Sequence, residues 1–515
     1  MDTILILDFG SQTCQLIARR IREIGVYTEI VPGDSAFLTV DLSQVKGIVL
    51  SGSPYSVYED GAPRVDKRFY DAGIPMLGIC YGFQRMTFDC GGEVESLSIK
   101  EYGRARVSFT GSSPLFAGVP DGFISWMSHG DSVKTPAANF HVIAQSENHI
   151  AAAWDETRNI YGIQFHPEVT HCEHGTTILK NFVLTICRAE PTWSMDTYLK
   201  EIFDDIRKRV NGKPVLLLIS GGVDSTVVAG LLLKALPPEN VHLMYIDTGL
   251  MRKNESVEVA ASLKSLGATH LYIVDASDRF LAALKGVTDP EEKRKLIGDL
   301  FMTVQETEIE KISIGDYFLA QGTLYTDMIE SGKGVGNKAQ VIKSHHNVRS
   351  PLVEAKRKAG LIIEPLSRLY KDEVRTLGRL IGIAESVIGR HPFPGPGLGV
   401  RILGEVTKEK CDILREADAI YIDELKRRGL YDEIWQAFAV LLPVRSVGVA
   451  GDAREYRYVL ALRAIVSHDG MTADVYPFNM QDILEISARI TNSVREIGRV
   501  VYDVSSKPPA TIEWE

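Results

Sequence analysis

Cysteine is scarce in this sequence, and both long apolar runs and an excess of positive charge are missing. No stretch approaches the roughly 20 apolar residues that a membrane-spanning helix needs, and the N-terminus lacks the charged region and cleavage site of a secretion signal. We therefore expect a cytoplasmic protein with no membrane partner. The six cysteines lack the spacing of a disulfide framework, so each thiol is judged alone: Cys14, Cys80, Cys90, Cys172, Cys187 and Cys411.

The charge balance argues against a nucleic-acid partner. Lys and Arg number 57 against 67 Asp and Glu, a formal net charge of -10, whereas proteins that bind phosphate backbones cluster Lys and Arg on one face. The chain is 45% hydrophobic and 24% charged, as in globular proteins. Since single cores stop growing near roughly 250 to 300 residues, 515 residues predict two or three domains.

The apolar pattern predicts an α/β domain over residues 1–190. Continuous rather than alternating apolar runs at Ile4–Phe9, Gly47–Ser51 and Pro75–Cys80 indicate strands buried on both faces, as in a parallel sheet covered by helices. Strand and turn residues dominate 93–153, and Gly175–Cys187 is predicted to be a closing helix.

The same rhythm restarts over residues 191–390, with strands predicted at Val215–Ser220, His242–Asp247 and His270–Asp275. Each crossover is long enough for a helix, so we expect a second parallel sheet with a ligand crevice at its strand ends. The fold class is therefore α/β, with two doubly wound parallel-sheet domains.

A third, smaller α+β domain is predicted over residues 391–515. It begins in a segment too rich in Pro and Gly for a helix or a central strand, His391–Gly397. The predicted elements beyond it are strands at Ser446–Val449, Arg457–Ile465 and Arg499–Val504 and a helix at Asp482–Val494.

Gly78-Ile79-Cys80-Tyr81-Gly82 follows a predicted strand and precedes a predicted helix. This is the cysteine form of a nucleophile elbow: the glycines permit a sharp turn that exposes the sulfur, and the helix N-terminus favours the thiolate. A free thiol with a pKa of about 8.5 still needs a base. His166 can supply it, and Glu168 can orient the imidazole.

These residues resemble the class I glutamine amidotransferases, which share the Gly-x-Cys-x-Gly elbow and the His-Pro-Glu segment. The resemblance implies an oxyanion hole from the backbone N–H groups of Gly52 and Tyr81. It also implies that Gln84 and a loop at Ser128–Asp131 lie near the bound glutamine.

A second cluster of ligand-type side chains, His171, Cys172, Glu173 and His174, lies just beyond the His-Pro-Glu segment. It lacks a second ligand pair at zinc spacing, so we expect neither zinc nor a redox cofactor.

A glycine-rich loop joins a predicted strand to a predicted helix further along the chain. Its glycines let backbone N–H groups approach an anion, and the helix N-terminus adds positive charge. The Lys-[Ser/Thr] ending of a Walker A loop is missing. The string is Ser220, Gly221, Gly222, Val223, Asp224, Ser225 and Thr226.

This string resembles the pyrophosphate loop of the N-type ATP pyrophosphatases, which adenylate a substrate oxygen using ATP and Mg²⁺. Thr226 stands where Ser is usual and keeps the hydroxyl. Asp247-Thr248-Gly249 is expected to border the nucleotide crevice. The sequence does not indicate which residues bind the metal.

Nearly the whole chain resembles one family that combines both activities, the glutamine-hydrolysing GMP synthases. The stretches that carry the resemblance are Lys293–Gly298, Gln321–Tyr325, Ile342–Asn347, His391–Leu398 and Ser506–Glu515. The resemblance implies glutamine, ATP and xanthosine monophosphate (XMP) as substrates, a homodimer, and Lys343 at the adenylation site. It also implies XMP contacts from Arg294, Asp452, Lys507, Ile512 and Glu513.

One departure from the family pattern concerns closure of a lid. Arg349 and Ser350 stand where the family has two glycines, and their loss could alter the closure or its rate.

Two alternatives remain. One is another amidotransferase coupled to a pyrophosphatase domain, such as an NAD synthetase or a tRNA-modifying enzyme. The acidic charge weighs against tRNA, and the Lys507–Glu515 tail favours XMP. The other is a catalytically idle nucleotide-binding regulator, which an assay for glutaminase activity and pyrophosphate release would distinguish.

Overall fold

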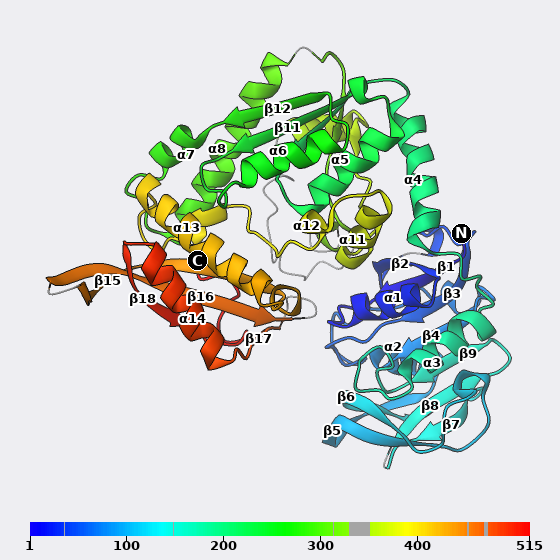
Figure 1. Cartoon of the computed structure of the whole chain (residues 1–515). Helices are drawn as coiled ribbons and strands as arrows, with labels where there is room; N and C mark the ends of the chain where they lie inside the picture. The colour runs from blue at the N-terminus through cyan, green and yellow to red at the C-terminus, as the bar shows by residue number, and fades with distance from the viewer. Residues whose placement is uncertain (36, 148, 313, 329–350, 451–452, 468–471) are drawn as a thin grey trace. The chain divides into compact units, whose positions relative to one another are not determined.

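The computed structural model describes residues 1–515 except 36, 148, 313, 329–350, 451–452 and 468–471. The chain divides into two compact units, the first built on Met1–Tyr198 and the second on Leu199–Tyr325 and His345–Glu515. The predicted α/β class with two parallel sheets and a smaller C-terminal α+β part is confirmed (Figure 1).

The first unit is built on one nine-stranded sheet in the order β2-β1-β3-β4-β9-β8-β7-β5-β6. The first five strands in this order, β2, β1, β3, β4 and β9, pair parallel with their neighbours. The remaining pairs are antiparallel. The strands are β1 (Thr3–Asp8), β2 (Tyr27–Pro32), β3 (Val45–Leu50), β4 (Met76–Ile79), β5 (Glu93–Phe109), β6 (Phe123–Thr135), β7 (His141–Gln145), β8 (Ile150–Asp155) and β9 (Ile160–Ile163).

Three helices pack on the parallel part of this sheet. They are α1 (Cys14–Glu23), α2 (Tyr81–Asp89) and α3 (Gly175–Lys180). Helix α1 contacts β1, β2 and α3, and α2 contacts β3, β4 and β9. The predicted closing helix is α-helical only to Lys180, and Asn181–Ile186 continues as a π-helix.

The second unit contains a five-stranded sheet, β12-β11-β10-β13-β14, whose pairs are all parallel. Its strands are β10 (Val215–Ile219), β11 (Val241–Asp247), β12 (His270–Asp275), β13 (Phe318–Ala320) and β14 (Ile362–Ile363). The helices of this segment are α4 (Met195–Val210), which begins in the first unit, α5 (Val223–Ala235), α6 (Glu255–Ser265), α7 (Ser277–Ala283), α8 (Pro290–Lys311), α10 (Pro351–Lys358), α11 (Lys371–Leu380) and α12 (Glu385–Ile388). Helix α9 (Tyr325–Met328) begins in the second unit, and its residues from Thr326 onward belong to the first.

The C-terminal part of the second unit pairs a strand-rich layer with two helices (Figure 1). Its elements are α13 (Lys408–Arg427), β15 (Gln436–Ala450), β16 (Ala453–Val466), β17 (Asp474–Val475), α14 (Met480–Ser493) and β18 (Ile497–Tyr502). Strand β16 pairs antiparallel with β15 and parallel with β18. The prediction began the first strand at Ser446, which is wrong, because the buried apolar run Ala437–Leu441 already belongs to β15.

One hydrophobic core joins the five-stranded sheet to the C-terminal part. Leu216 and Met244 of the sheet belong to the same buried cluster as Leu414 of α13, Leu460 of β16 and Ile486 of α14. The predicted boundary at residue 390 therefore separates two segments that share buried apolar contacts.

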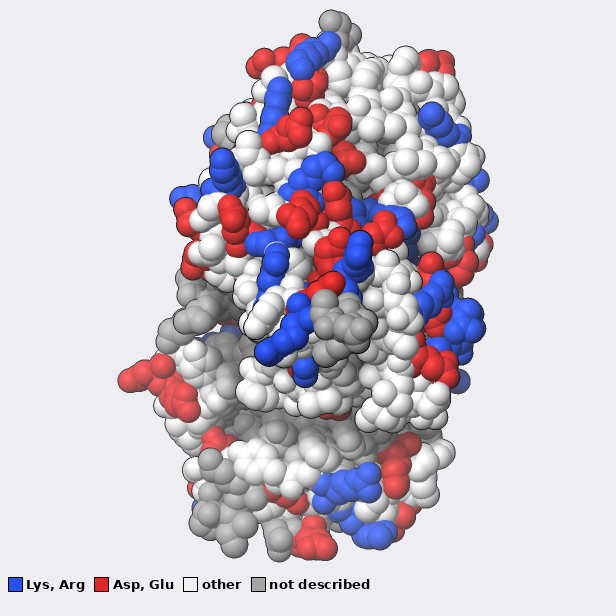
Figure 2. Space-filling model, turned by 60° about the vertical axis from the view of Figure 1, so that its left-hand side comes forward, with Lys and Arg blue, Asp and Glu red and all other residues white. Residues whose placement is uncertain are grey.

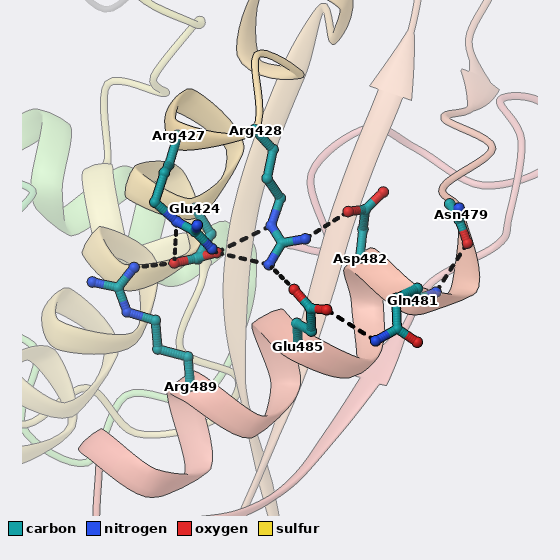
Figure 3. A network of polar contacts seen from close by, with 8 residues as sticks. All are labelled: Glu424, Arg427, Arg428, Asn479, Gln481, Asp482, Glu485 and Arg489. Atoms are coloured by element: carbon teal, nitrogen blue, oxygen red, sulfur yellow. Dashed lines mark hydrogen bonds and ion pairs between the residues drawn. The ribbon is translucent and has the colours of Figure 1, made fainter.

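Helices α13 and α14 are also linked by a network of ion pairs (Figure 3). The Glu424 carboxylate accepts from Arg427 at 2.6 Å and from Arg428 at 3.0 Å, and it pairs with Arg489 of α14. Hydrogen bonds from Arg427, followed by those from Arg489 and Arg428, lower the pKa of Glu424 to about 2 despite its burial.

Charges of both signs are interspersed on the face of the molecule drawn in Figure 2. Among the residues that the structure describes, no helix is long and apolar enough to cross a membrane.

Candidate functional site

Cys80 lies on a sharp turn between strand β4 and helix α2. Its backbone has φ 54° and ψ -108°, a left-handed conformation that is costly for a residue with a Cβ and clusters at functional sites. The neighbouring glycines are required by close packing: a Cβ on Gly82 would lie 2.4 Å from the Leu50 carbonyl oxygen, and one on Gly78 would lie 2.4 Å from Met86. The sequence therefore forms the predicted elbow.

His166 and Glu168 form a buried pair beside this elbow. The His166 Nδ1 lies 2.8 Å from Glu168 Oε1, and the Glu168 side chain has no exposed surface. Burial lowers the pKa of His166, but the Glu168 charge and hydrogen bonds with Cys80 and Glu168 outweigh it and raise the pKa well above its ordinary value. The imidazole can thus accept and hold a proton next to the thiol.

Four other thiols are poor nucleophiles because they are buried. Burial raises the pKa of Cys14, Cys172, Cys187 and Cys411, which disfavours the reactive thiolate. The elbow at Cys80, with its neighbouring histidine, is therefore the best-placed nucleophile in the first unit.

Of the residues predicted for the oxyanion hole, Tyr81 directly follows Cys80 and Gly52 lies near His166. Tyr81 is the first residue of α2, so its N–H has no acceptor within the helix. Gly52 follows β3, and a Cβ on it would lie 3.5 Å from His166 Cε1. Gln84 is buried, and its Nε2 donates to the Asp131 carbonyl oxygen at 2.7 Å.

Ser128–Asp131 was predicted to be a loop, and this is wrong because the segment lies within β6. It still borders the elbow, since Cys80 Sγ lies 3.8 Å from the Ser128 carbonyl oxygen. His129 pairs across the strands with Glu101, with Nε2 3.0 Å from Oε2. Glu101 was not identified from the sequence. The pairing register of β5 with β6 shifts between Ser96 and Glu101, so no regular spacing in the sequence indicates that Glu101 lies opposite His129.

The residues rejected as a zinc site have protein partners in the first unit. The His171 ring packs against Trp126 with centroids 4.6 Å apart, and Ser125 Oγ donates to Cys172 Sγ at 3.3 Å.

In the second unit, Ser220–Gly222 connects β10 to α5, and Val223–Thr226 forms the first turn of α5. Gly221 has φ +79°, a conformation that glycine adopts without strain. Ser225 Oγ donates to the Gly222 carbonyl oxygen at 3.1 Å, and Thr226 Oγ1 donates to the same oxygen at 2.9 Å. Thr226 thus supplies a hydroxyl hydrogen bond that closes the loop.

Two other segments follow the strands that pair with β10. Gly322, which follows β13, approaches the loop so closely that a Cβ on it would lie 3.5 Å from the Ser225 backbone nitrogen. Asp247 ends β11, where its carboxylate accepts from Gly249 N–H at 2.8 Å and from Ser256 Oγ at 2.5 Å. The segments that follow the paired parallel strands β10, β11 and β13 are thus the Ser220 loop, Asp247–Gly249 and Gly322.

Lys371 is a loop partner that the sequence reasoning missed. Its Nζ lies 2.6 Å from both carboxylate oxygens of Asp224. The missed signal was a lysine at the first position of a helix, α11, where the helix dipole disfavours a cation.

Arg294 contacts the C-terminal tail, which itself carries three other residues predicted to contact XMP: Lys507, Ile512 and Glu513. Arg294 of α8 donates to the Glu515 carbonyl oxygen, and Lys507 pairs through its backbone with Ala473. Ile512 packs beside Phe438. The other predicted residues, Asp452, Lys343, Arg349 and Ser350, lie outside the described residues.

Three buried cations that the sequence reasoning did not single out hold this tail. Arg401 bonds the Glu513 carboxylate, Lys293 bonds Glu515, and the side chains of Arg401, Lys293 and Arg463 have no exposed surface. We call Lys293, Arg401 and Arg463 the tail clamp. Their hydrogen-bond partners within Ser505–Glu515 are 42 to 222 residues away, so no local pattern connects them.

Comparison with known families assigns the three segments separately. The model of "Glutamine amidotransferase class-I" matches residues 5–186, that of "NAD synthase" matches residues 196–298, and that of "GMP synthase C terminal domain" matches residues 423–514.

Curated relatives match along the whole chain. Proteins called "GMP synthase [glutamine-hydrolyzing]" from Brucella suis and Brucella abortus are each 52% identical over 518 aligned positions, covering 100% of this chain and 99% of theirs. A solved structure from Thermoplasma acidophilum, described as that of a proposed GMP synthase component, is 34% identical, with TM-score 0.32, and covers 36% of this chain and 94% of that one. The similarity over the full chain shows that it belongs to the family of glutamine-hydrolysing GMP synthases.

Proposed function

We propose that this chain converts XMP to GMP, using ammonia released from glutamine and activation of XMP by ATP. The observation that carries the proposal is the presence of two separate chemistries on one polypeptide. The Cys80, His166 and Glu168 cluster lies in the first unit, and the Ser220–Thr226 loop lies in the second.

In the first reaction, the Cys80 thiolate attacks the carbonyl carbon of the glutamine amide. The N–H groups of Gly52 and Tyr81 stabilise the oxyanion. His166 gives its proton to the leaving amine, so ammonia departs and a thioester remains on Cys80. Water, deprotonated by His166, then releases glutamate.

In the second reaction, the O2 oxygen of XMP attacks the α-phosphate of ATP and pyrophosphate leaves. The Ser220–Thr226 loop binds the phosphates through backbone N–H groups and the N-terminus of α5. Ammonia then attacks C2 of the adenylated XMP, and AMP departs to leave GMP. Lys343 is proposed to act at the adenylation step, and Arg294, Asp452, Lys507, Ile512 and Glu513 to bind XMP.

Mg²⁺ is proposed to enter with ATP. Proteins commonly hold Mg²⁺ through one or two carboxylates together with substrate phosphates, and Asp224 provides a partly exposed carboxylate within the loop. The 2.6 Å pair with Lys371 already places a cation on this carboxylate. We infer that Asp224 would hold the metal of MgATP, which would neutralise phosphate charge, and that Lys371 would then be available to bind a phosphate.

Three functional parts are proposed within this scheme: a glutamine amidotransferase over 1–190, an adenylating part over 191–390 and a C-terminal XMP-binding and dimerising part over 391–515. We place the protein in the cytoplasm, a proposal supported by its six free thiols.

A homodimer through the C-terminal part is supported by exposed apolar side chains on neighbouring strands. Val447 of β15 pairs directly with Tyr456 of β16, and these side chains are 41% and 62% exposed. Apolar patches of this kind mark interaction surfaces. Light scattering should give twice the chain mass, and the Tyr456→Arg variant should shift it towards the monomer.

The experiment that tests the proposed function measures pyrophosphate release with ATP, Mg²⁺, ammonium and a panel of acceptors. XMP should support release, and deamidated NAD, the acceptor expected of an NAD synthase, should not. Release with another acceptor but not with XMP would overturn the proposal.

A further inference from the structure

The Arg401 guanidinium binds the Glu513 carboxylate of the tail at two points. Arg401 Nε donates to Glu513 Oε2 at 3.1 Å, and Nη2 donates to Oε1 at 2.8 Å. A two-point bond of this kind fixes the plane of the carboxylate as well as its position.

The guanidinium is itself held in place by two aromatic rings. Its central carbon lies 4.1 Å from the Phe438 ring centroid and 5.0 Å from that of Phe393. Phe393 belongs to the Pro-Gly-rich segment, and the Arg401 carbonyl oxygen accepts from Leu441 N–H of β15 at 2.8 Å. With no exposed surface, the Arg401 side chain has little freedom to change its orientation.

The hydrogen bonds that Glu513 accepts leave one lone pair available, on its Oε2 atom. Oε1 accepts from both Arg401 and Gln436 Nε2, the latter at 2.8 Å, which uses its two lone pairs. Oε2 accepts from Arg401 alone among the described residues. A carboxylate oriented in this way can accept one further N–H from a ligand.

We propose that Arg401 is a positioning residue, which holds Glu513 so that Oε2 accepts a hydrogen bond from a ring N–H of the XMP base. This inference rests on the proposed function. The xanthine ring carries N–H donors, and a partly buried carboxylate with a fixed plane selects for a donor at one position. Gln436 assists by holding Oε1, and Phe393 assists by keeping the guanidinium in place.

The test is the Arg401→Lys variant, assayed for GMP formation from ammonium, ATP and a range of XMP concentrations. Lysine keeps the charge but cannot make the two-point bond. We expect the KM for XMP to rise at least about tenfold, while the KM for ATP and the glutaminase rate without XMP change less than about twofold. A purely structural role would instead lower all the activities together.

Arg22→Lys is the matched control. Arg22 is also buried, donates to the Thr28 side chain and backbone at 2.9 Å and 3.0 Å, and lies 4.8 Å from the Tyr27 ring. Its replacement should leave the KM for XMP unchanged. If Arg401→Lys does not fold, Gln436→Met provides the same test, with an expected rise of about threefold.

A double-mutant cycle identifies the route of the effect. If Arg401 acts through Glu513, the Arg401→Lys and Glu513→Gln variant should have the same KM for XMP as Glu513→Gln alone. Additive effects, or an unchanged KM in Arg401→Lys, would overturn the inference while leaving the proposed function intact. Failure of the unsubstituted protein to make GMP would overturn both.

Discussion

The Cys80 site and the tail site are assembled over very different lengths of chain. At the first, the His166 and Glu168 side chains that bond each other are two residues apart, and the strand-turn-helix geometry around Cys80 is local. At the second, Glu513 reaches Arg401 across 112 residues and Glu515 reaches Lys293 across 222. Short motifs therefore determine the amidotransferase geometry, whereas three buried cations that are far apart in the chain, Lys293, Arg401 and Arg463, hold the C-terminal tail.

Glu168→Gln is the sharpest way to break the local site. Without the carboxylate charge, the pKa of His166 falls and its ring loses its orientation. We expect glutamine hydrolysis, measured as glutamate release, to drop about 1,000-fold. GMP formation from ammonium is the control and should be unchanged. A loss of less than about tenfold would show that His166 works without Glu168.

Acid should weaken the second unit through His391, whose ring is buried. Its Nδ1 accepts from Ala437 N–H at 3.1 Å and its Nε2 lies 2.9 Å from the Tyr431 carbonyl oxygen, so the neutral form fits. Burial lowers the pKa of His391 to about 4, whereas the unfolded chain has a pKa near 6.5. The neutral ring thus contributes stability above pH 6.5 that is lost as the pH falls towards about 4.

The loss approaches about 3 kcal/mol of unfolding free energy, because each pH unit between the two pKa values is worth about 1.4 kcal/mol. Urea unfolding at several pH values measures it. His391→Gln should flatten the pH dependence between pH 6.5 and 4, whereas His141→Gln, on the exposed edge of β7, should not. An unchanged slope in His391→Gln would contradict the assignment.

The difference between a site built from neighbouring residues and one built from distant residues also determines what the sequence could predict. The elbow at Cys80 and the loop at Ser220 were predicted because their glycines, apolar strands and helix starts are adjacent in the chain. The strand location of Ser128–Asp131 was missed because its pairing with Glu101 depends on a shifted hairpin register. The tail clamp was missed because a single buried Arg or Lys looks like a surface residue until its distant partner is known.

Gly221→Ala tests whether the conformation of the Ser220 loop, like that of the Cys80 elbow, depends on a glycine within it. Alanine at φ +79° costs about 1 to 2 kcal/mol, and its Cβ would lie 3.1 Å from Val259. We expect the KM for ATP to rise about tenfold. Gly267→Ala is the control, with φ +94° and open space around it, and should leave that KM unchanged. Equal effects of the two changes would contradict a specific role for the loop.

Glu424→Gln gives the smallest expected effect and tests the ion-pair network that links α13 to α14 (Figure 3). The carboxylate is buried, but Arg427 and Arg489 are 62% and 47% exposed, so water can replace part of the lost interaction. We expect about 1 to 2 kcal/mol of destabilisation in urea unfolding, with GMP formation retained. Glu409→Gln, an exposed change on the same helix, should cost less than about 0.5 kcal/mol, and an equal cost would contradict the role of the network.

The division of labour between the two regions is tested most directly by GMP formation in the Cys80→Ala variant, with glutamine or ammonium as the nitrogen source. The account predicts that synthesis from glutamine is abolished and that synthesis from ammonium proceeds at the rate of the unsubstituted protein. Loss of both activities, or retention of the glutamine-dependent activity, would contradict it.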